Sequence, residues 1–241
     1  MLKSSVIAID GPSGTGKSTL AKLLAKEFHF LYVDTGAMFR AIAYICVREQ
    51  WPLFTADADH FQQILSEKLL HLDLQYAPSE SVLITINGTD VTPFLRTEEI
   101  AHVASQLAKF PVVRNFILSA EQKLAQEKTI VMEGRDIGTI VFPQAFCKFF
   151  LTAAPEERAR RRQSQLEKQT GVKPEFATIL AAISQRDKED VSRTVAPLKP
   201  AVDAIVFDTT NFAKEEVIAR LKLEVQKKLD RQENQTNDKR N

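Results

Sequence analysis

The residues with the clearest chemical purpose form one glycine-rich stretch near the start of the chain. It follows the pattern G-x-x-x-x-G-K-[ST], and its residues are Gly11, Pro12, Ser13, Gly14, Thr15, Gly16, Lys17, Ser18 and Thr19. The backbone N–H groups of such a loop can point inward at phosphate oxygens, and a following helix adds the positive end of its dipole. The lysine reaches the β- and γ-phosphates, and the serine hydroxyl ligates Mg²⁺. This phosphate loop predicts an ATP site in which Lys17 is catalytic and Ser18 binds the metal ion.

The segments on either side of the phosphate loop are those that its chemistry requires. Val6–Asp10 is a short apolar run typical of a buried strand, and residues 20–26 place apolar side chains at helical spacing. A Gly/Ser-rich turn that matches the pattern by accident would not need these flanks. The order strand, loop, helix therefore favours a nucleoside triphosphate site over a surface turn.

The rest of the chain supplies a scaffold of alternating strands and helices. Five apolar runs are strand candidates, at residues 6–9, 30–33, 129–132, 148–151 and 204–207. Strands that alternate with helices predict a parallel sheet covered on both faces. Functional residues of such folds gather at the carboxyl ends of the strands. Asp34, Thr35 and Arg40 follow the second run, where a second substrate would bind.

The alternation is interrupted between residues 51 and 110. A helix is predicted over residues 61–70, and strands over 72–76 and 82–86. The Asn87-Gly88 pair that follows is a strong hairpin signal, and residues 90–91 are a third strand candidate. This segment predicts a small antiparallel insert in an otherwise parallel protein.

Arginines are unusually frequent near the strand ends. Guanidinium groups bind phosphate in a bidentate manner, so these residues suggest an acceptor that itself carries a phosphate. The arginines in question are Arg40, Arg114, Arg135, Arg186 and Arg193. A second pair, Arg158 and Arg162, lies four residues apart on a helix that begins at Pro155. Each could be an ordinary solvated side chain, but in a phosphoryl-transfer enzyme arginines on a mobile segment stabilise the transferring group.

Composition excludes several classes of protein. The 241 residues are 44% hydrophobic and 26% charged, with a net charge of +1, which argues against a nucleic-acid-coating surface. The apolar runs are too short for a membrane span, and the N-terminus lacks a signal-peptide pattern. Cys46 and Cys147 are too few for a disulfide framework and are expected to be buried thiols. We therefore expect a soluble, cytoplasmic protein.

Other nucleotide-binding classes need motifs that this sequence lacks. A GTPase would carry an Asn-Lys-x-Asp motif after a late strand, and a motor ATPase would carry a long apolar strand ending in Asp-Glu. A small-molecule kinase with a phosphate-bearing acceptor fits better. A nucleotide-sensing module without turnover stays open, although it would leave the arginines unexplained.

Four blocks of the sequence, in order, resemble the bacterial cytidylate kinases of the nucleoside monophosphate kinase family. They are residues 9–18, 34–40, 133–139 and 186–198, and the resemblance extends from Val6 to about Leu221. Phe39 stands where the family often has Tyr, and Glu133 where it often has Asp. The resemblance implies an α/β fold, with a three-layer P-loop kinase core around a five-stranded parallel sheet. The core would comprise residues 1–34, 111–153 and 170–229, with a monophosphate-binding insert at 35–110, a helical lid at 154–169 and a disordered tail at 230–241.

The resemblance also implies an activity: transfer of the γ-phosphoryl group of ATP to CMP or dCMP, with Mg²⁺, by a monomer. Arg40 and Arg135 would hold the CMP phosphate, with Thr35 nearby. The cytosine would be read by Ser105, Arg114 and Asp136. Arg186 and Asp190 would contact the ribose, with Arg193 near the phosphates or sugar, and Arg158 and Arg162 would close over the ATP phosphates. UMP, AMP and shikimate remain alternative acceptors.

Overall fold

We describe the protein from a computed structural model, which describes residues 5–52, 58–77 and 82–238. The chain forms two compact units. Unit 1 comprises residues 1–32 and 129–241, and unit 2 comprises residues 33–128. Each unit is described by itself below.

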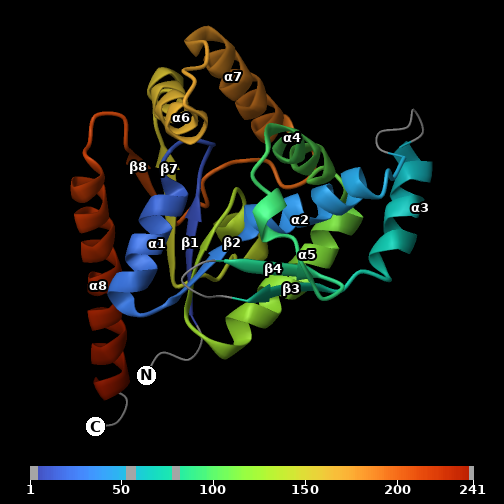
Figure 1. The fold of residues 1–241 in the computed structure, drawn as a ribbon. Helices are drawn as coiled ribbons and strands as arrows, with labels where there is room; N and C mark the ends of the chain where they lie inside the picture. The colour runs from blue at the N-terminus through green and yellow to red at the C-terminus, as the bar shows by residue number, and fades with distance from the viewer. Residues whose placement is uncertain (1–4, 53–57, 78–81, 239–241) are drawn as a thin grey trace. The chain divides into compact units, whose positions relative to one another are not determined.

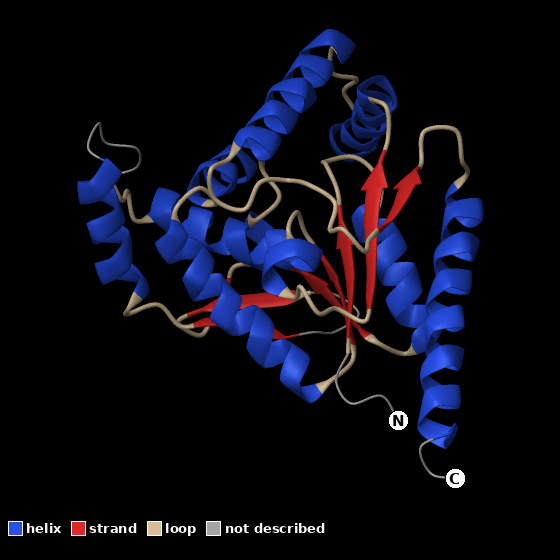
Figure 2. Cartoon of the chain, turned by 180° about the vertical axis from the view of Figure 1, so that it is seen from behind, coloured by secondary structure: helices blue, strands red, loops and turns tan. Residues whose placement is uncertain are grey.

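Unit 1 is built on a five-stranded sheet with the strand order β2-β6-β1-β7-β8 (Figures 1 and 2). The strands are β1 (Val6–Asp10), β2 (Leu31–Asp34), β6 (Ile130–Glu133), β7 (Cys147–Thr152) and β8 (Ile205–Asp208). β1 pairs in parallel with β6 and β7, and β7 pairs in parallel with β8. Every residue of β1 is buried, as expected for the central strand of a sheet covered on both faces. The predicted five-stranded parallel sheet is confirmed.

Two long helices of unit 1 share one apolar core with the sheet. They are α1 (Lys17–Phe28) and α8 (Lys214–Asp238), which pack on each other (Figure 1). Leu24 of α1 and Leu221 of α8 are fully buried with Ile7 and Phe149 of the strands. Although α8 is long, its sequence is polar, and none of the helices in the described ranges is apolar enough to span a membrane.

Two further helices of unit 1, α6 (Pro155–Thr170) and α7 (Phe176–Ser192), pack together as a pair. A small apolar cluster joins them, with Ala159, Ile179 and Ile183 buried at its centre. A short π-helix, η2 (Ile137–Val141), follows β6 and contacts β1. Single π-turns occur often at functional sites, and this one was not predicted.

Unit 2 combines helices with a three-stranded antiparallel sheet. The helices are α2 (Thr35–Arg48), α3 (Ala58–Leu69), α4 (Glu98–Leu107), α5 (Pro111–Glu127) and the 3₁₀ turn η1 (Thr92–Phe94). The strands are β3 (Leu74–Ala77), β4 (Leu83–Ile86) and β5 (Thr89–Asp90), in that order in the sheet. Asn87 and Gly88 both have positive φ between β4 and β5, as a two-residue hairpin turn requires. The predicted antiparallel sheet is confirmed.

The structure differs from the predicted division of the chain at two places. α5 packs on α3, α2 and β3, so residues 111–128 belong to unit 2 and not to the core in which the sequence placed them. The closing helix was expected to end at residue 229, with a disordered tail beyond, but α8 continues to Asp238. The tail lacks an apolar stripe, which is why its composition suggested disorder, yet it contains no helix breaker. Residues 239–241 lie outside the described ranges.

Both cysteines are free and buried, as predicted. Burial raises the pKa of Cys46 to about 12 and that of Cys147 to about 11. Thiols with such high pKa values carry almost no thiolate at neutral pH, so neither is a nucleophile.

Candidate active site

The phosphate loop joins the end of β1 to the start of α1 and packs closely against β7. Gly11 has φ +143°, and a Cβ atom at this position would lie 2.0 Å from the carbonyl oxygen of Leu151. Only glycine fits there. The loop also closes on itself, because Thr15 Oγ1 and Lys17 Nζ both donate to the Pro12 carbonyl, at 3.1 and 2.7 Å.

Lys17 is buried at the first turn of α1, where the electrostatics favour an anionic ligand. Burial and the neighbouring charge of Arg135 lower the pKa of Lys17 to about 7, while Glu133 acts in the opposite direction. A bound polyphosphate would supply further negative charge and hold the lysine in its charged form. The position of the Lys17 side chain therefore suits an anionic ligand such as a phosphate.

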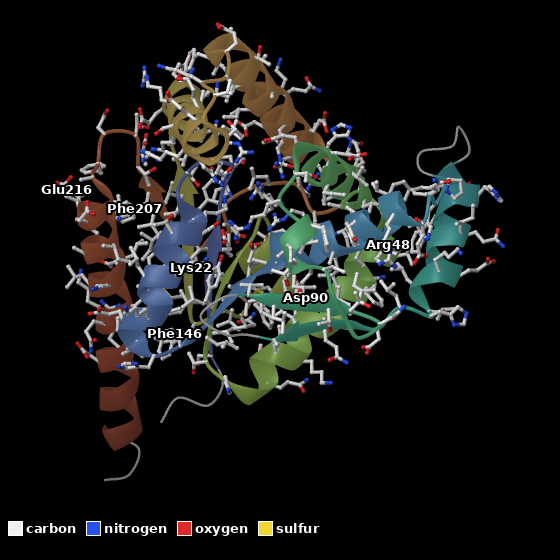
Figure 3. The ribbon with its side chains drawn as sticks, in the orientation of Figure 1. Lys22, Arg48, Asp90, Phe146, Phe207 and Glu216 are labelled. Atoms are coloured by element: carbon white, nitrogen blue, oxygen red, sulfur yellow. The ribbon has the colours of Figure 1, made fainter. Side chains whose placement is uncertain are left out.

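Glu133, the last residue of β6, connects the phosphate loop to the sheet. Its Oε2 accepts a hydrogen bond from Ser18 Oγ at 2.9 Å, and its Oε1 accepts one from the Tyr32 hydroxyl. Lys22 of α1 lies with its Nζ 5.3 Å from the centre of the Tyr32 ring (Figure 3 labels Lys22). Glu133 was not among the predicted site residues, although an acidic residue at the end of a buried strand was visible in the sequence.

The oxygens of Ser18 and Glu133 fit a magnesium ion. Mg²⁺ prefers oxygen ligands, and in phosphoryl-transfer sites it is usually bound by one or two protein groups together with substrate phosphates. In the described ranges no group of three or more His, Cys, Asp or Glu residues forms a dedicated metal cage. The donor set is thus suited to an ion that is held partly by the nucleotide.

A second cluster in unit 1 gathers arginines around one buried carboxylate. Arg135 Nε donates to Asp190 Oδ2 at 3.0 Å, and Arg193 forms an ion pair with Asp190 Oδ1. Burial disfavours the charge of Asp190, but Arg135, Arg193 and Arg186 outweigh it and lower the pKa of this carboxyl. We call Arg135, Arg186, Asp190 and Arg193 the arginine cluster. Three arginines surround this one carboxylate, and the sequence predicted all four residues as site residues.

Arg158, which the sequence assigned to the ATP phosphates, is buried in this structure. Its guanidinium donates to the carbonyls of Ala153 and Ser13, at 2.9 and 3.1 Å, and to both carboxylate oxygens of Asp187 on α7. The side chain is only 3% exposed, so it joins α6, α7 and the phosphate loop. The packing of α6 on α7 brings Asp187 to Arg158, which spacing along the chain could not reveal.

The neighbouring arginines of α6 differ from each other. Arg162 is half-buried and donates to Gln165 at 3.1 Å on its own helix. Arg161, which was not singled out, donates to the Thr209 carbonyl at 2.7 Å, and the Thr209 hydroxyl donates to the Thr15 carbonyl at 3.3 Å. Arg161 thus supports the phosphate loop from the end of β8.

The predicted acceptor residues of unit 2 lie on α2 and on two helices that each pack against it, α4 and α5. Thr35 opens α2, Ser105 is buried on α4, and Arg114 is on α5. Arg40 Nη2 donates at 2.9 Å to Asp34, whose carboxylate also caps α2 through the Ala37 N–H.

Arg114 is held in two ways. Its Nη1 donates to the Ala108 carbonyl at 3.3 Å, and its guanidinium lies 5.8 Å from the centre of the Phe39 ring. An aromatic face attracts a nearby cation, so the Phe39 ring and the Ala108 carbonyl both hold the guanidinium in place. Unit 2 therefore holds Thr35, Arg40, Ser105 and Arg114 in ordered positions.

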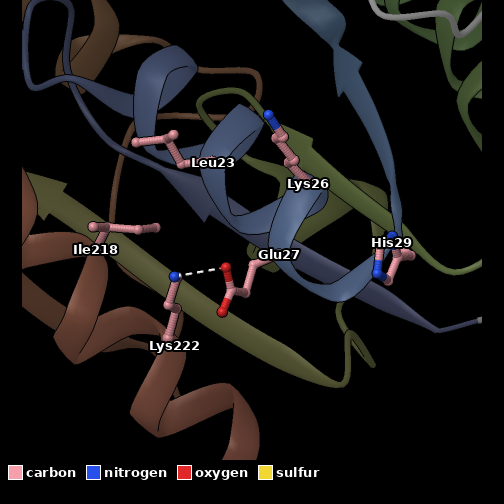
Figure 4. A pocket seen from close by; sticks show the side chains of 6 residues that line it. All are labelled: Leu23, Lys26, Glu27, His29, Ile218 and Lys222. Carbon is pink, nitrogen blue, oxygen red and sulfur yellow. Dashed lines mark ion pairs between the residues drawn. The ribbon is translucent and has the colours of Figure 1, made fainter.

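A separate pocket of about 410 Å³ lies between α1 and α8 (Figure 4). It is lined by Leu23, Lys26, Glu27, His29, Ile218 and Lys222. Lys222 Nζ forms an ion pair with Glu27 at 2.7 Å. Leu23, Lys26 and Glu27 lie in the second half of α1, His29 follows that helix, and Ile218 and Lys222 lie on α8. None of them belongs to the phosphate loop at the start of α1, so the pocket is not part of the phosphate site.

A glycine loop between a central parallel strand and a helix, with a buried lysine and a serine–carboxylate pair, defines the class of P-loop nucleotide-binding proteins. The sequence profile of the cytidylate kinase family matches residues 7–227. The chain belongs to the cytidylate kinase family.

Its relatives are similar over nearly their full length. The cytidylate kinase of Maridesulfovibrio salexigens is 45% identical over 93% of this chain and 97% of its own. Those of Mannheimia succiniciproducens and Pasteurella multocida are 43% and 42% identical, over 91% and 95% of this chain and 95% and 99% of their own. The solved structure of shikimate kinase from Bacteroides thetaiotaomicron has a TM-score of 0.46 at 14% identity, over 92% of this chain and 98% of that chain, which is a weak likeness.

Proposed function

We propose that this protein transfers the γ-phosphoryl group of ATP to CMP or dCMP, giving ADP and CDP or dCDP for pyrimidine nucleotide metabolism. The observation that carries the proposal is the pairing of a complete phosphate loop with the arginine cluster in one unit. The loop suits the donor, and the cluster suits a second phosphate. Membership of the cytidylate kinase family supports the choice of CMP.

On the donor side, the backbone of residues 11–19 forms the cradle and Lys17 supplies the charge nearest the transferred group. Ser18 and Glu133 would hold Mg²⁺, which neutralises the charge on the phosphate oxygens when it is bound. Arg158 and Arg161 act indirectly in this proposal. Arg158 donates to the Ser13 carbonyl of the phosphate loop, and Arg161 donates to the carbonyl of Thr209, whose hydroxyl contacts the loop. Arg162 remains a proposed partner of the ATP phosphates.

On the acceptor side, we assign the phosphate to Arg40 and Arg135, and we assign Thr35, five residues before Arg40, to the same substrate. Ser105, Arg114 and Asp136 would read the cytosine edge, whose exocyclic amine needs an acceptor. Arg186 and Asp190 would contact the ribose, with Arg193 near the phosphates or sugar. A base that leaves a buried polar group without its partner is strongly rejected, which would disfavour uracil.

The reaction does not require a strong general base or a covalent intermediate on the protein. The attacking group is a phosphate oxygen of CMP, which is already an anion at neutral pH, so no strong general base is required. Catalysis then depends on positioning the two phosphates and on neutralising their charge. Lys17 and the arginines provide both.

The proposed partners are small molecules, with no nucleic acid and no membrane, and the proposed state is a cytoplasmic monomer. The near-zero net charge supports the first point, because a nucleic-acid-binding protein normally carries a basic excess. The two reduced, buried thiols are consistent with a reducing compartment.

Removal of Lys17 tests the donor half of this proposal. Lys17→Ala should lower CMP-dependent ADP formation by at least about 10²-fold, as expected when a charged donor to the transferring group is lost. The fold should persist, as judged by circular dichroism. Lys26→Ala, on the same helix but at the separate pocket, is the matched control and should keep wild-type turnover. Near-normal activity of Lys17→Ala would overturn the assignment.

A further inference from the structure

A buried carboxylate, Asp10, ends β1 directly before the phosphate loop. The residue is only 4% exposed. Its Oδ1 accepts a hydrogen bond from the Ile137 N–H at 2.8 Å, and its Oδ2 accepts one from the Gly138 N–H at 2.7 Å. These two amides open the π-helix η2, where backbone donors have no partner inside the helix. Asp10 therefore joins the strand of the phosphate loop to the segment that follows β6.

This connection lies where the pairing of the two strands ends. β1 and β6 stay in parallel register as far as Ile9 and Glu133, and the Gly134 N–H donates to the Ile9 carbonyl at 3.1 Å. Beyond that point β1 leads into the phosphate loop, whereas β6 leads into Arg135 and Asp136. The Asp10 carboxylate thus fixes the second segment to the first just past the last strand pairing.

The two amide donors at this position are best satisfied by a carboxylate. The ionised carboxylate, however, lowers folding stability because it is buried. Two amides need two acceptor oxygens, and an asparagine would offer one oxygen and turn its NH₂ group towards the other amide. Burial raises the pKa of Asp10 to about 6, although the two amides and Lys17 act in the opposite direction. Ionisation of a buried carboxyl lowers folding stability. A carboxylate that is kept in such a position next to a reactive site therefore indicates a role in function.

We propose that Asp10 is a positioning residue for phosphoryl transfer, which fixes the Arg135–Asp136 turn relative to the phosphate loop. The proposal rests on the function proposed above, in which Arg135 holds the acceptor phosphate and Asp136 reads its base. Asp10 itself is assigned no contact with either substrate. If the turn shifts, acceptor binding weakens, while the backbone of residues 11–19 still binds ATP.

Gly138 offers an independent way to disturb the same connection. A Cβ atom there would lie 3.1 Å from Lys148 Cδ and 3.3 Å from Asp10 Oδ2. Lys148 cannot move aside freely, since its Nζ donates to the Pro143 carbonyl at 2.6 Å and to Asp203 at 2.7 Å. Gly138→Ala would therefore press on the carboxylate and displace the turn without changing the charge of Asp10.

The test compares Asp10→Asn and Gly138→Ala with Val225→Ala, a buried residue of α8 that serves as a control for general loss of stability. Steady-state kinetics are measured with each substrate varied at saturation of the other. We expect the KM for CMP to rise by about tenfold or more in both test variants, while the KM for ATP changes by less than about twofold. Val225→Ala should change neither.

Backbone hydrogen exchange of residues 134–142, measured without nucleotide, reads the connection independently of activity. Exchange should accelerate in Asp10→Asn and Gly138→Ala and stay unchanged in Val225→Ala. Unaltered exchange, or equal effects on CMP and ATP, would overturn the proposal. If Asp10→Asn does not fold, Gly138→Ala decides the same question. If the wild-type protein does not phosphorylate CMP, the proposed function fails, whereas the exchange measurement still reports on Asp10.

Discussion

Glu133 Oε2 accepts a hydrogen bond from Ser18 Oγ at 2.9 Å, although the two residues are 115 positions apart in the chain. The parallel pairing of β1 with β6 places the end of β6 beside the start of α1. A hydroxyl and a carboxylate that meet in this way provide the protein oxygens for the proposed magnesium site.

Glu133→Gln tests this site, because glutamine keeps the size of the side chain and one acceptor oxygen but removes the charge. We expect the Mg²⁺ concentration for half-maximal activity to rise by about 10–100-fold. Mn²⁺ binding in the presence of ATP, followed by electron paramagnetic resonance, should weaken in parallel. Glu27→Gln, at the separate pocket, is the control. An unchanged metal requirement in Glu133→Gln would remove Glu133 from the site.

The Arg158–Asp187 pair should contribute to stability, because it is largely buried. The side chains are 3% and 23% exposed. Removing one partner of a buried pair typically costs about 3–5 kcal/mol, since the other charge loses its compensation. In a double-mutant cycle with Arg158→Met and Asp187→Asn, followed by urea unfolding, we expect a coupling of at least about 1 kcal/mol.

The control cycle uses Lys227 and Glu224, an exposed pair within α8 whose coupling should be below about 1 kcal/mol. Additive effects of Arg158→Met and Asp187→Asn would show that the pair is not coupled. In that case the buried arginine would be held by the carbonyls of Ala153 and Ser13 alone.

The features that the sequence predicted well are local. The phosphate loop is a contiguous pattern, and the five apolar runs and the Asn87-Gly88 turn each specify a short element. The rule that parallel strands place their carboxyl ends at one edge then brings Lys17 near Arg135 without further information. Arg186 and Arg193 were also predicted as site residues, and the structure brings both to the Asp190 carboxylate, together with Arg135.

The features that the sequence missed depend on contacts between distant segments. Asp187 meets Arg158 only because α6 packs on α7, and Asp10 meets Ile137 only because η2 folds back on β1. Neither pair has a spacing that marks it. The family resemblance placed residues 111–128 in the core, but α5 packs on α3 and β3.

If Ser105 and Arg114 contact the base, substitutions of these residues should change the preference for CMP over UMP without abolishing activity. Ser105→Ala and Arg114→Met should each lower the ratio of kcat/KM for CMP to that for UMP by about tenfold, since each removes a hydrogen-bonding group from the proposed base contacts. Ser119→Ala is the control, because the Ser119 hydroxyl bonds to the Asn115 carbonyl at 3.1 Å on its own helix. An unchanged ratio in both test variants would place the base elsewhere.

The raised pKa of Asp10 predicts a pH dependence of folding stability. Between the ordinary pKa of 3.8 and the folded value of about 6, the folded state keeps a proton that the unfolded state has lost. Stability therefore falls as pH rises through this window, by about 3 kcal/mol in total.

Asp10→Asn has no carboxyl proton to lose at this position, so its folding stability should not show the fall with pH that Asp10 causes. The free energy of unfolding of the variant minus that of the wild type should increase by about 2 kcal/mol from pH 4 to pH 7, as measured by urea unfolding across the range. If the difference in unfolding free energy between variant and wild type stays constant with pH, the pKa of Asp10 is not raised in the folded protein.

The central claim is that the acceptor is a cytidine monophosphate. It is tested most directly by the rate of ADP release from ATP and Mg²⁺ with CMP, dCMP, UMP, AMP or shikimate as the sole acceptor. The account predicts turnover with CMP and dCMP well above that with the other three. Preference for UMP, AMP or shikimate would contradict the acceptor assignment, and ATP binding without acceptor-dependent turnover would contradict the enzyme itself.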